Sequence, residues 1–228
     1  LQTWINARGG ELRGAVRVGR TSALEASVYQ PLDRAHRWFV EPGASAQRSL
    51  EDIFGDGEAV TRTEFSSAWG YADVGRVFGN RAELRAGIRS GVQSADRDFG
   101  ARTVFDVDTE GYGGFASRFT FDSRDRDVLW RAGTVARVSY FRSSDALGAE
   151  ADSYERLEGT ATLLLPFRQN VGYLRVGGGS SLDTVLPLYD TFTLGGPVSL
   201  PGLSLGELRG DSYWTVQAAY LQRLADLN

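Results

Sequence analysis

Residues 84–93 read Leu-Arg-Ala-Gly-Ile-Arg-Ser-Gly-Val-Gln, and the alternation of side chains in this stretch decides the fold. Successive side chains of a β-strand point to opposite faces of a sheet, so a period of two predicts a strand with two different faces. One face carries Leu84 and Ile88, and the other carries Arg85 and Arg89.

The same period recurs along nearly the whole chain, and no stretch shows a sustained helical period of 3.6 residues. The sequence therefore predicts an all-β fold with about 10–12 strands in this segment. The predicted strands are residues 12–18, 23–32, 37–49, 59–78, 82–97, 104–122, 129–143, 153–167, 171–182 and 213–225, with a partial strand at 1–6.

Tight and long connections roughly alternate between these strands. Tight ones lie at residues 78–81 and 166–170, and polar, Gly- and Asp-rich ones lie at 52–57, 97–100, 144–148 and 183–212. Membrane barrels have short periplasmic turns and longer external loops. The pattern therefore favours a transmembrane antiparallel β-barrel.

A soluble β-sandwich also alternates, and it remains the alternative. Its strands usually have about 5–6 residues, whereas the segments here are longer. Aromatic residues such as Trp38, Trp69 and Trp214 lie near segment ends, as in the aromatic girdles of membrane barrels. These observations favour the membrane barrel.

The composition excludes several kinds of chemistry. All 25 basic residues are Arg, against 29 acidic residues, and the chain has no Cys and one His, His36. Thiol catalysis, disulfides and a structural zinc site are therefore excluded, and we expect no cofactor and no metal. The net charge of -4, with Arg spread along the chain, argues against a nucleic-acid partner.

Two short segments match known functional motifs in sequence, but the residues around them do not fit those motifs. Residues 202–206 match the G-x-S-x-G nucleophile motif, but Pro201 precedes them and no helix follows, so we expect Ser204 not to be catalytic. Residues 106–111 begin like a calcium loop, but its twelfth position is Ser117 instead of Glu. We therefore predict no catalytic residue in this segment.

Charged residues on the inward face are expected to fill a barrel interior without requiring a substrate. The predicted lumen-facing charges are Arg85, Arg89, Arg118 and Asp122. Residues 122–127 alternate in sign, which indicates ion pairs formed locally in a turn.

Residues 191–203 form a long, Gly-rich and apolar connection between two strands. Phe192 and Leu194 require burial, which an extended external loop would not give them. Gly195 and Gly196 let the backbone turn and approach a wall closely. We therefore expect this loop to fold back into the lumen.

At these residues the chain resembles the bacterial surface antigen barrel family, which includes the outer-membrane barrel-assembly insertase and the two-partner-secretion transporters. Phe192, Leu194, Gly195 and Gly196 match the family pattern F-x-L-G-G of a loop folded into the lumen. Pro201-Gly202-Leu203 stands where the family has an Arg-Gly-aromatic tip. Because Pro201 cannot make the charged contact of that Arg, we expect packing, more than a salt bridge, to hold the loop.

Further motifs are similar to the branch of this family that is fused to a patatin-like phospholipase. They are residues 10–13 (Gly-Glu-Leu-Arg), 29–33 (Tyr-Gln-Pro-Leu-Asp), 37–42 (Arg-Trp-Phe-Val-Glu-Pro) and 206–213 (Gly-Glu-Leu-Arg-Gly-Asp-Ser-Tyr). Residues 121–125 (Phe-Asp-Ser-Arg-Asp) resemble the mid-barrel D-x-R-D turn of the whole family. The motifs occur in the expected order and span nearly the whole chain.

The resemblance implies that residues 1–228 are an outer-membrane β-barrel domain, incomplete at both ends, from a barrel of 16 strands. Periplasmic domains and a patatin-like serine hydrolase domain are expected outside this segment, which itself is not an enzyme. The implied function is to anchor or translocate that lipase in type V secretion. The implied partners are outer-membrane lipid, the fused patatin domain and the barrel-assembly machinery, with a homo-oligomer left open.

Two other functions remain as alternatives. One is an outer-membrane insertase or channel without a passenger. The other is a barrel enzyme that hydrolyses lipid or peptide with His36 and a nearby Ser or Asp.

Overall fold

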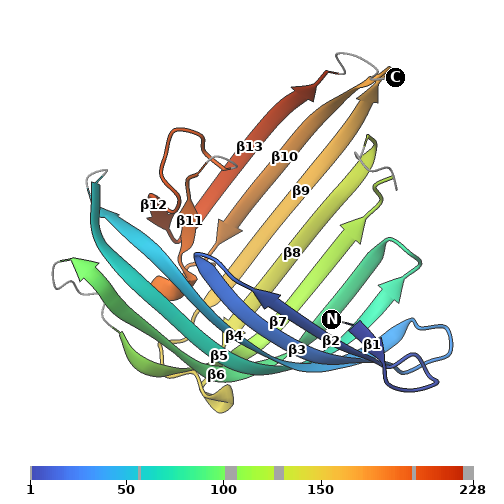
Figure 1. The fold of residues 1–228 in the computed structure, drawn as a ribbon, viewed down its shortest axis with the longest axis horizontal. Coiled ribbons are helices and arrows are strands. Elements are labelled where there is room, and N and C mark those ends of the chain that lie inside the picture. The colour runs from blue at the N-terminus through green and yellow to red at the C-terminus, as the bar shows by residue number, and fades with distance from the viewer. Residues whose placement is uncertain (1, 56–57, 101–106, 126–130, 197–198, 223–228) are drawn as a thin grey trace.

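The computed structural model describes residues 2–55, 58–100, 107–125, 131–196 and 199–222. About two thirds of them belong to one antiparallel sheet of 11 strands, and a separate two-stranded ribbon lies beside it (Figure 1). The all-β fold class and the number of strands predicted for this segment are thereby confirmed.

Neighbouring strands in the sheet are consecutive in the chain, except that β10 pairs with β13. The sheet strands are β1 (Gln2–Trp4), β2 (Glu11–Arg17), β3 (Thr21–Pro31), β4 (Trp38–Gly55), β5 (Glu58–Phe78), β6 (Ala82–Gly100), β7 (Val107–Asp122), β8 (Gly133–Ser143), β9 (Glu155–Phe167), β10 (Asn170–Ser180) and β13 (Ser212–Leu221). The ribbon consists of β11 (Phe192–Leu194) and β12 (Leu208–Gly210), and two short 3₁₀ helices are η1 (Asp145–Leu147) and η2 (Leu188–Asp190).

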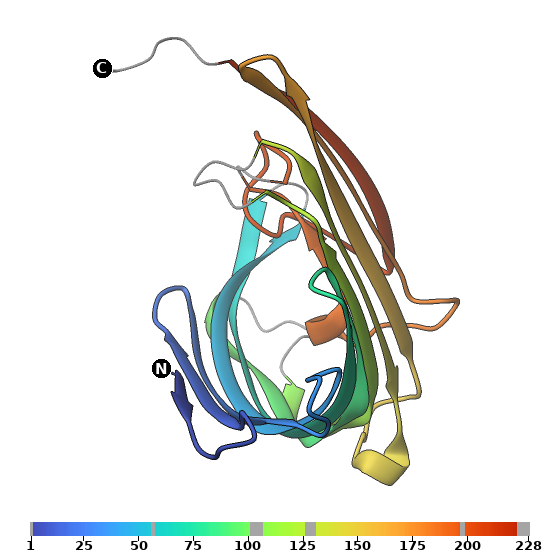
Figure 2. The same cartoon turned by 90° about the vertical axis from the view of Figure 1, so that its right-hand side faces the viewer.

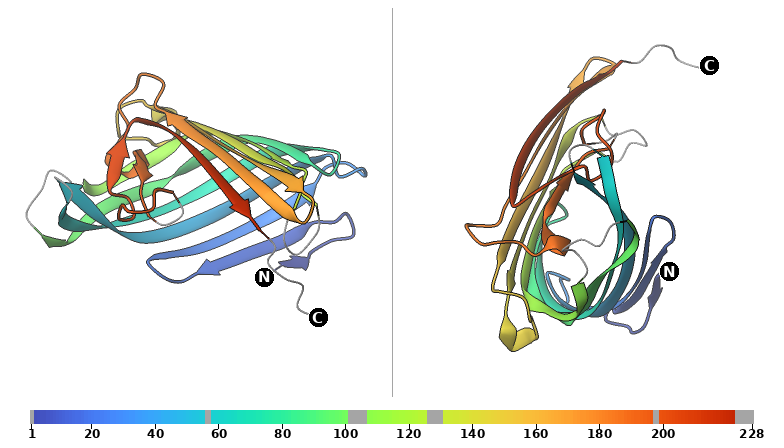
Figure 3. Two further views of the ribbon diagram at one scale, coloured as in Figure 1. Left: turned by 90° about the horizontal axis from the view of Figure 1, so that it is seen from above. Right: turned by 90° about the vertical axis from the view of Figure 1, so that its left-hand side faces the viewer.

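The sheet curls strongly about one axis, so that it has a concave and a convex face (Figures 2 and 3). Among the described residues β1 and β13 are the two edges, each paired on one side. Within the connection between β10 and β13, residues 181–211, the elements η2, β11 and β12 lie on the concave side (Figure 3).

Strands β4 and β6 are longer than the sequence pattern indicated. Residues 52–55 and 97–100, interpreted as parts of connections, belong to β4 and β6. Residues 107–111, which begin β7, are likewise strand and not a calcium loop. At residues 52–55 and 97–100, backbone pairing continues although apolar and polar residues no longer alternate clearly in the sequence. A prediction from this alternation alone therefore misses these two strand ends.

No helix within the described residues is long and apolar enough to cross a membrane.

Candidate functional site

The two faces of the sheet carry opposite kinds of side chain. Leu84 and Ile88 on the convex face remain 46% and 43% exposed, whereas the Arg85 side chain between them in sequence is 17% exposed. The same alternation of exposure follows β5 from Ser67 to Phe78. Polar groups thus gather on the concave face, which is the candidate functional surface.

Arg85 is the centre of an ion-pair cluster on this face. Its guanidinium nitrogens lie 2.6 Å from Glu83, 3.1 Å from Glu41 and 3.6 Å from Asp73. Glu41 also accepts a hydrogen bond of 2.9 Å from the Ser27 hydroxyl. Glu41 and Asp73 are 6% and 5% exposed, so their charges are satisfied inside the protein.

An apolar cluster holds the connection 181–211 against the concave face. Phe192 and Leu186 of this connection pack with Phe141 of β8 and Tyr154, which precedes β9. The Arg156 guanidinium lies 4.4 Å from the centre of the Phe192 ring. The structure thus places the Phe192 side chain, 3% exposed, in the interior of the curled sheet.

Gly179 on β10 makes this packing possible. A Cβ at that position would lie 2.5 Å from the Phe192 ring and 2.7 Å from the Tyr213 ring. Both distances are far below van der Waals contact, so the ring of Phe192 occupies space that only a glycine leaves open.

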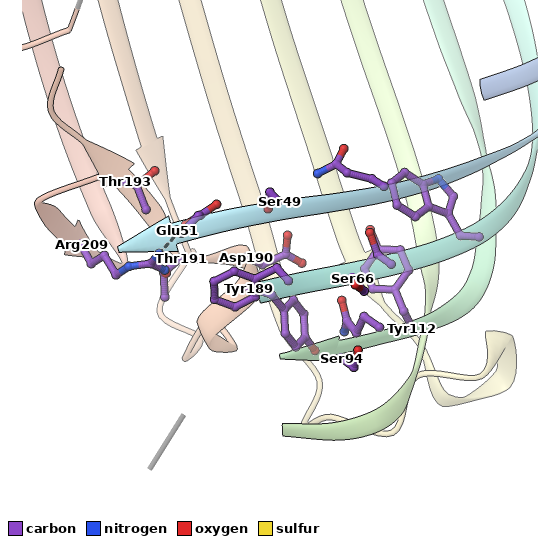
Figure 4. Close-up of a pocket in the computed structure, with 15 residues that line it drawn as sticks. Ser49, Glu51, Ser66, Ser94, Tyr112, Tyr189, Asp190, Thr191, Thr193 and Arg209 are labelled. Atoms are coloured by element: carbon purple, nitrogen blue, oxygen red, sulfur yellow. Dashed lines mark hydrogen bonds and ion pairs between the residues drawn. The ribbon is translucent and has the colours of Figure 1, made fainter. Parts of the chain in front are cut away.

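A second contact ties the same connection to the opposite wall. Arg209 on β12 forms an ion pair with Glu51 on β4 and donates hydrogen bonds to the Leu188 carbonyl and the Thr191 hydroxyl (Figure 4). The Arg209 side chain is 17% exposed. The connection is therefore held both by the packing of Phe192 and by an ion pair of Arg209, which lies outside the loop residues for which packing was expected.

The connection and the wall enclose a polar cavity of about 230 Å³, shown in Figure 4. Its lining includes Glu51, Tyr112, Tyr189 and Asp190. Burial raises the pKa of the Asp190 carboxyl, which lies in the connection between strands, although the Tyr154 hydroxyl donates a hydrogen bond to it.

The predicted loop residues occupy two different environments. Phe192, Gly195 and Gly196 are buried and Leu194 is half-buried, whereas Pro201 and Gly202 are exposed at the far end of the loop. Gly195 and Gly196 have φ values of 134° and 87°, which an L-residue adopts only with strain. The turn at these positions therefore requires glycine.

The predicted lumen charges are placed in two groups. Arg85, Arg89 and Arg118 lie in the inward-facing rows of β6 and β7. Asp122 lies at the end of β7 and pairs with Arg124 at 2.6 Å, with its side chain 42% exposed. Asp122 thus lies in the same row of β7 as Arg118, at the end of the strand, where its charge is paired locally with Arg124.

The residues of the weaker motifs are not brought together. His36 lies between β3 and β4, at one end of the strands, and Ser204 lies in the connection that leaves from the opposite end. The Ser204 backbone N–H donates a hydrogen bond of 2.6 Å to Glu207. Among the described residues, no group of three or more His, Asp or Glu could hold a metal ion.

Sequence reasoning missed Arg209, Glu51 and the Tyr154–Asp190 contact. One signal for Arg209 was available, since it is the single basic residue between Arg175 and Arg223. Its partner lies 158 residues away, and no local pattern identifies a contact of that separation.

No protein-family model matches this chain, and no curated protein matches it. Among solved structures, the chain is similar to the crystal structure of BamA from Haemophilus ducreyi lacking POTRA domains 1–3. The TM-score is 0.67 at 13% sequence identity, over 87% of this chain and 41% of that one. The chain thus has the fold of the BamA barrel and spans less than half the length of that structure.

Proposed function

We propose that this segment is part of a β-barrel embedded in the outer membrane of a bacterium. The observation that carries the proposal is the distribution of side chains, with apolar groups exposed on the convex face and ion pairs sheltered on the concave face. In water, such a convex face would be an extended exposed apolar surface, which soluble monomers avoid. In a bilayer the same face is solvated by acyl chains.

The dimensions of the convex apolar band support this environment. On β5 the outward row is apolar or small from Ala68 to Val74 and is bounded by Ser66 and Arg76. From Ser66 to Arg76, the two residues that bound this row, the strand rises about 33 Å, or about 23 Å across a membrane at a tilt of about 45°. This matches the apolar band of about 25 Å in known membrane barrels.

Aromatic residues border this band. Trp214 and Tyr220 lie in the outward row of β13, separated by Val216 and Ala218, and are 78% and 59% exposed. The Arg76 guanidinium lies 5.2 Å from the Trp38 ring. Amphipathic rings of this kind are typical of the membrane–water interface.

Cell fractionation tests the membrane assignment. We expect the complete protein to stay with outer-membrane fragments after carbonate washing. We also expect its apparent mass on denaturing gels to differ between heated and unheated samples. Recovery as a monodisperse protein in buffer without detergent would exclude the proposed location.

Within that membrane we propose that the barrel anchors or translocates a fused patatin-like lipase. The ordered resemblance of residues 10–13, 29–33, 37–42 and 206–213 to the patatin branch supports this function. The connection 181–211 also supports this function. It contacts opposite walls of the curled sheet through Phe192 and Arg209, so it lies where a translocating chain would pass.

The test measures whether the lipase domain of the complete protein is exposed on the surface of intact cells. We expect protease or antibody added outside to reach that domain, and Arg209→Ala to lower the fraction reached. Arg142→Ala, which changes an arginine on the convex face, serves as the matched control. Equal surface display in all three proteins would exclude a role of the connection in translocation.

An insertase or channel without a passenger is the second candidate, and the similarity to the BamA barrel supports it. Depletion of the protein would then lower the amounts of other outer-membrane proteins. A barrel enzyme is a third candidate, tested by substituting His36 and Ser204 with alanine. Loss of hydrolysis in either variant would support that candidate.

A further inference from the structure

A second cavity on the concave face, beside η2, is lined by four arginines from four successive strands. Its volume is about 350 Å³. Two carboxylates, those of Glu158 and Asp190, also belong to its lining. The arginines are Arg89 of β6, Arg118 of β7, Arg137 of β8 and Arg156 of β9.

Both carboxylates already have partners. Glu158 lies 3.0 Å from the Arg156 guanidinium and accepts a hydrogen bond of 2.9 Å from the Tyr213 hydroxyl. Asp190 accepts a hydrogen bond from the Tyr154 hydroxyl and lies in the interior. Beyond these contacts, Asp190 interacts with Arg89 and Asp73 with Arg118 electrostatically without forming a close ion pair.

Arg89, Arg118 and Arg137 form no ion pair within 4.0 Å in the part of the chain that the structure describes. The Nε of Arg89 is buried and has no hydrogen-bond partner there. Arg118 lies directly opposite Arg85 on the neighbouring strand, and like charges at such positions are destabilising. Arg85 forms ion pairs with Glu83 and Glu41, whereas Arg118 has only the more distant charge of Asp73.

We propose that this four-arginine cavity binds a phosphoryl group that enters through the lumen. Three guanidinium groups without a close ion pair favour a ligand with more than one negative charge, which a phosphoryl group has and a single carboxylate lacks. Guanidinium groups also bind phosphoryl oxygens in a bidentate geometry. The arginines face the concave side, so the ligand reaches them from the lumen and not from the acyl chains outside.

Titration of the complete protein in detergent micelles with inorganic phosphate at constant ionic strength tests this site. We expect saturable binding by calorimetry and a rise in the thermal unfolding midpoint. Arg118→Gln should weaken binding by about tenfold or more, because a charge-assisted contact to the anion is lost. Arg137→Gln, at an exposed part of the rim, should weaken it without endangering folding.

Arg175→Gln is the matched control, since Arg175 faces inward on β10 but lines a different cavity. It should leave phosphate binding unchanged. Absence of saturable binding, or equal affinity in the wild-type protein and both the Arg118 and Arg137 variants, would overturn the proposal. Equally tight binding of acetate would overturn the preference for a phosphoryl group.

The source of the phosphoryl group is distinguished by two further titrations. Glycerol 3-phosphate represents a soluble ester, and dihexanoyl phosphatidic acid represents a lipid headgroup. Binding of the soluble ester as tight as that of the lipid supports a soluble ligand. At least about tenfold tighter binding of the lipid, which corresponds to 1.4 kcal/mol, supports a headgroup.

Discussion

Arg209 is the residue whose removal should most directly release the connection 181–211 from the wall. We expect Arg209→Ala to lower the free energy of unfolding by about 1–2 kcal/mol, because the ion pair and two hydrogen bonds are lost. Denaturant titration in detergent measures this loss. Arg142→Ala removes a pair at 3.6 Å with the Arg142 side chain 60% exposed, and should cost less than about 1 kcal/mol. Equal losses would show that Arg209 does not anchor the connection.

Asp33 should make stability depend on pH in the acid range. The backbone N–H groups of Trp38 and Arg37 each donate a hydrogen bond of 2.8 Å to its carboxylate and hold its pKa below the usual value. A lowered pKa stabilises the folded state above the unfolded pKa of about 4, and this contribution disappears as the pH falls through the folded pKa.

The comparison of wild type with Asp33→Asn checks this dependence. The wild-type protein should be the more stable of the two at pH 7, and the difference should shrink as the pH is lowered below about 4. A difference that stays constant from pH 7 to pH 3 would show that the charge of Asp33 does not contribute.

At the scale of the strand, two neighbours on β4 should respond oppositely to the same change. Ala46 faces outward and Gln47 inward. We expect Ala46→Arg to destabilise the folded barrel by about 2–4 kcal/mol in lipid, because the charge would lie in the apolar band. Gln47→Arg should be tolerated in the polar lumen. Refolding yields in vesicles measure both, and the reverse order would show that the faces are inverted.

The packing of the connection against β10 gives a second prediction at this scale. Gly179→Ala should cost about 1–3 kcal/mol, because the new methyl group overlaps the Phe192 ring. Gly159→Ala is the control, since a Cβ there meets its nearest atom at an ordinary 3.7 Å. Protease sensitivity within residues 181–211 should rise in the first variant alone.

The strands could be predicted from the sequence wherever one face of the sheet meets polar surroundings and the other face meets apolar surroundings, because polar and apolar residues then alternate. Residues 59–78 are one strand, as their alternation indicated, and β5 covers Glu58–Phe78. The pattern failed at residues 52–55 and 97–100, where polar residues suggested connections. Arg209 and Glu51 could not be found, because their contact depends on how far the whole sheet curls.

For the whole molecule, the proposed orientation in the membrane can be checked with tryptophan fluorescence. Trp214 is 78% exposed on the convex face, whereas Trp69 lines the cavity on the concave face. In vesicles with brominated acyl chains, a variant that retains only Trp214 should be quenched strongly. A variant that retains only Trp69 should respond to aqueous acrylamide instead. Quenching of Trp69 by the lipid would contradict the orientation.

The length of β4 and β5 has a consequence for the surface of the cell. The 21 residues of β5 extend about 70 Å, or about 50 Å in height at a tilt of about 45°, which is twice the apolar band of about 25 Å. The excess lies at the end opposite the β5–β6 turn, where Arg62 and Glu64 replace the apolar residues of the outward row. In the proposed membrane this end of the sheet would stand clear of the bilayer, at a height where antibodies and other macromolecules can reach its convex face.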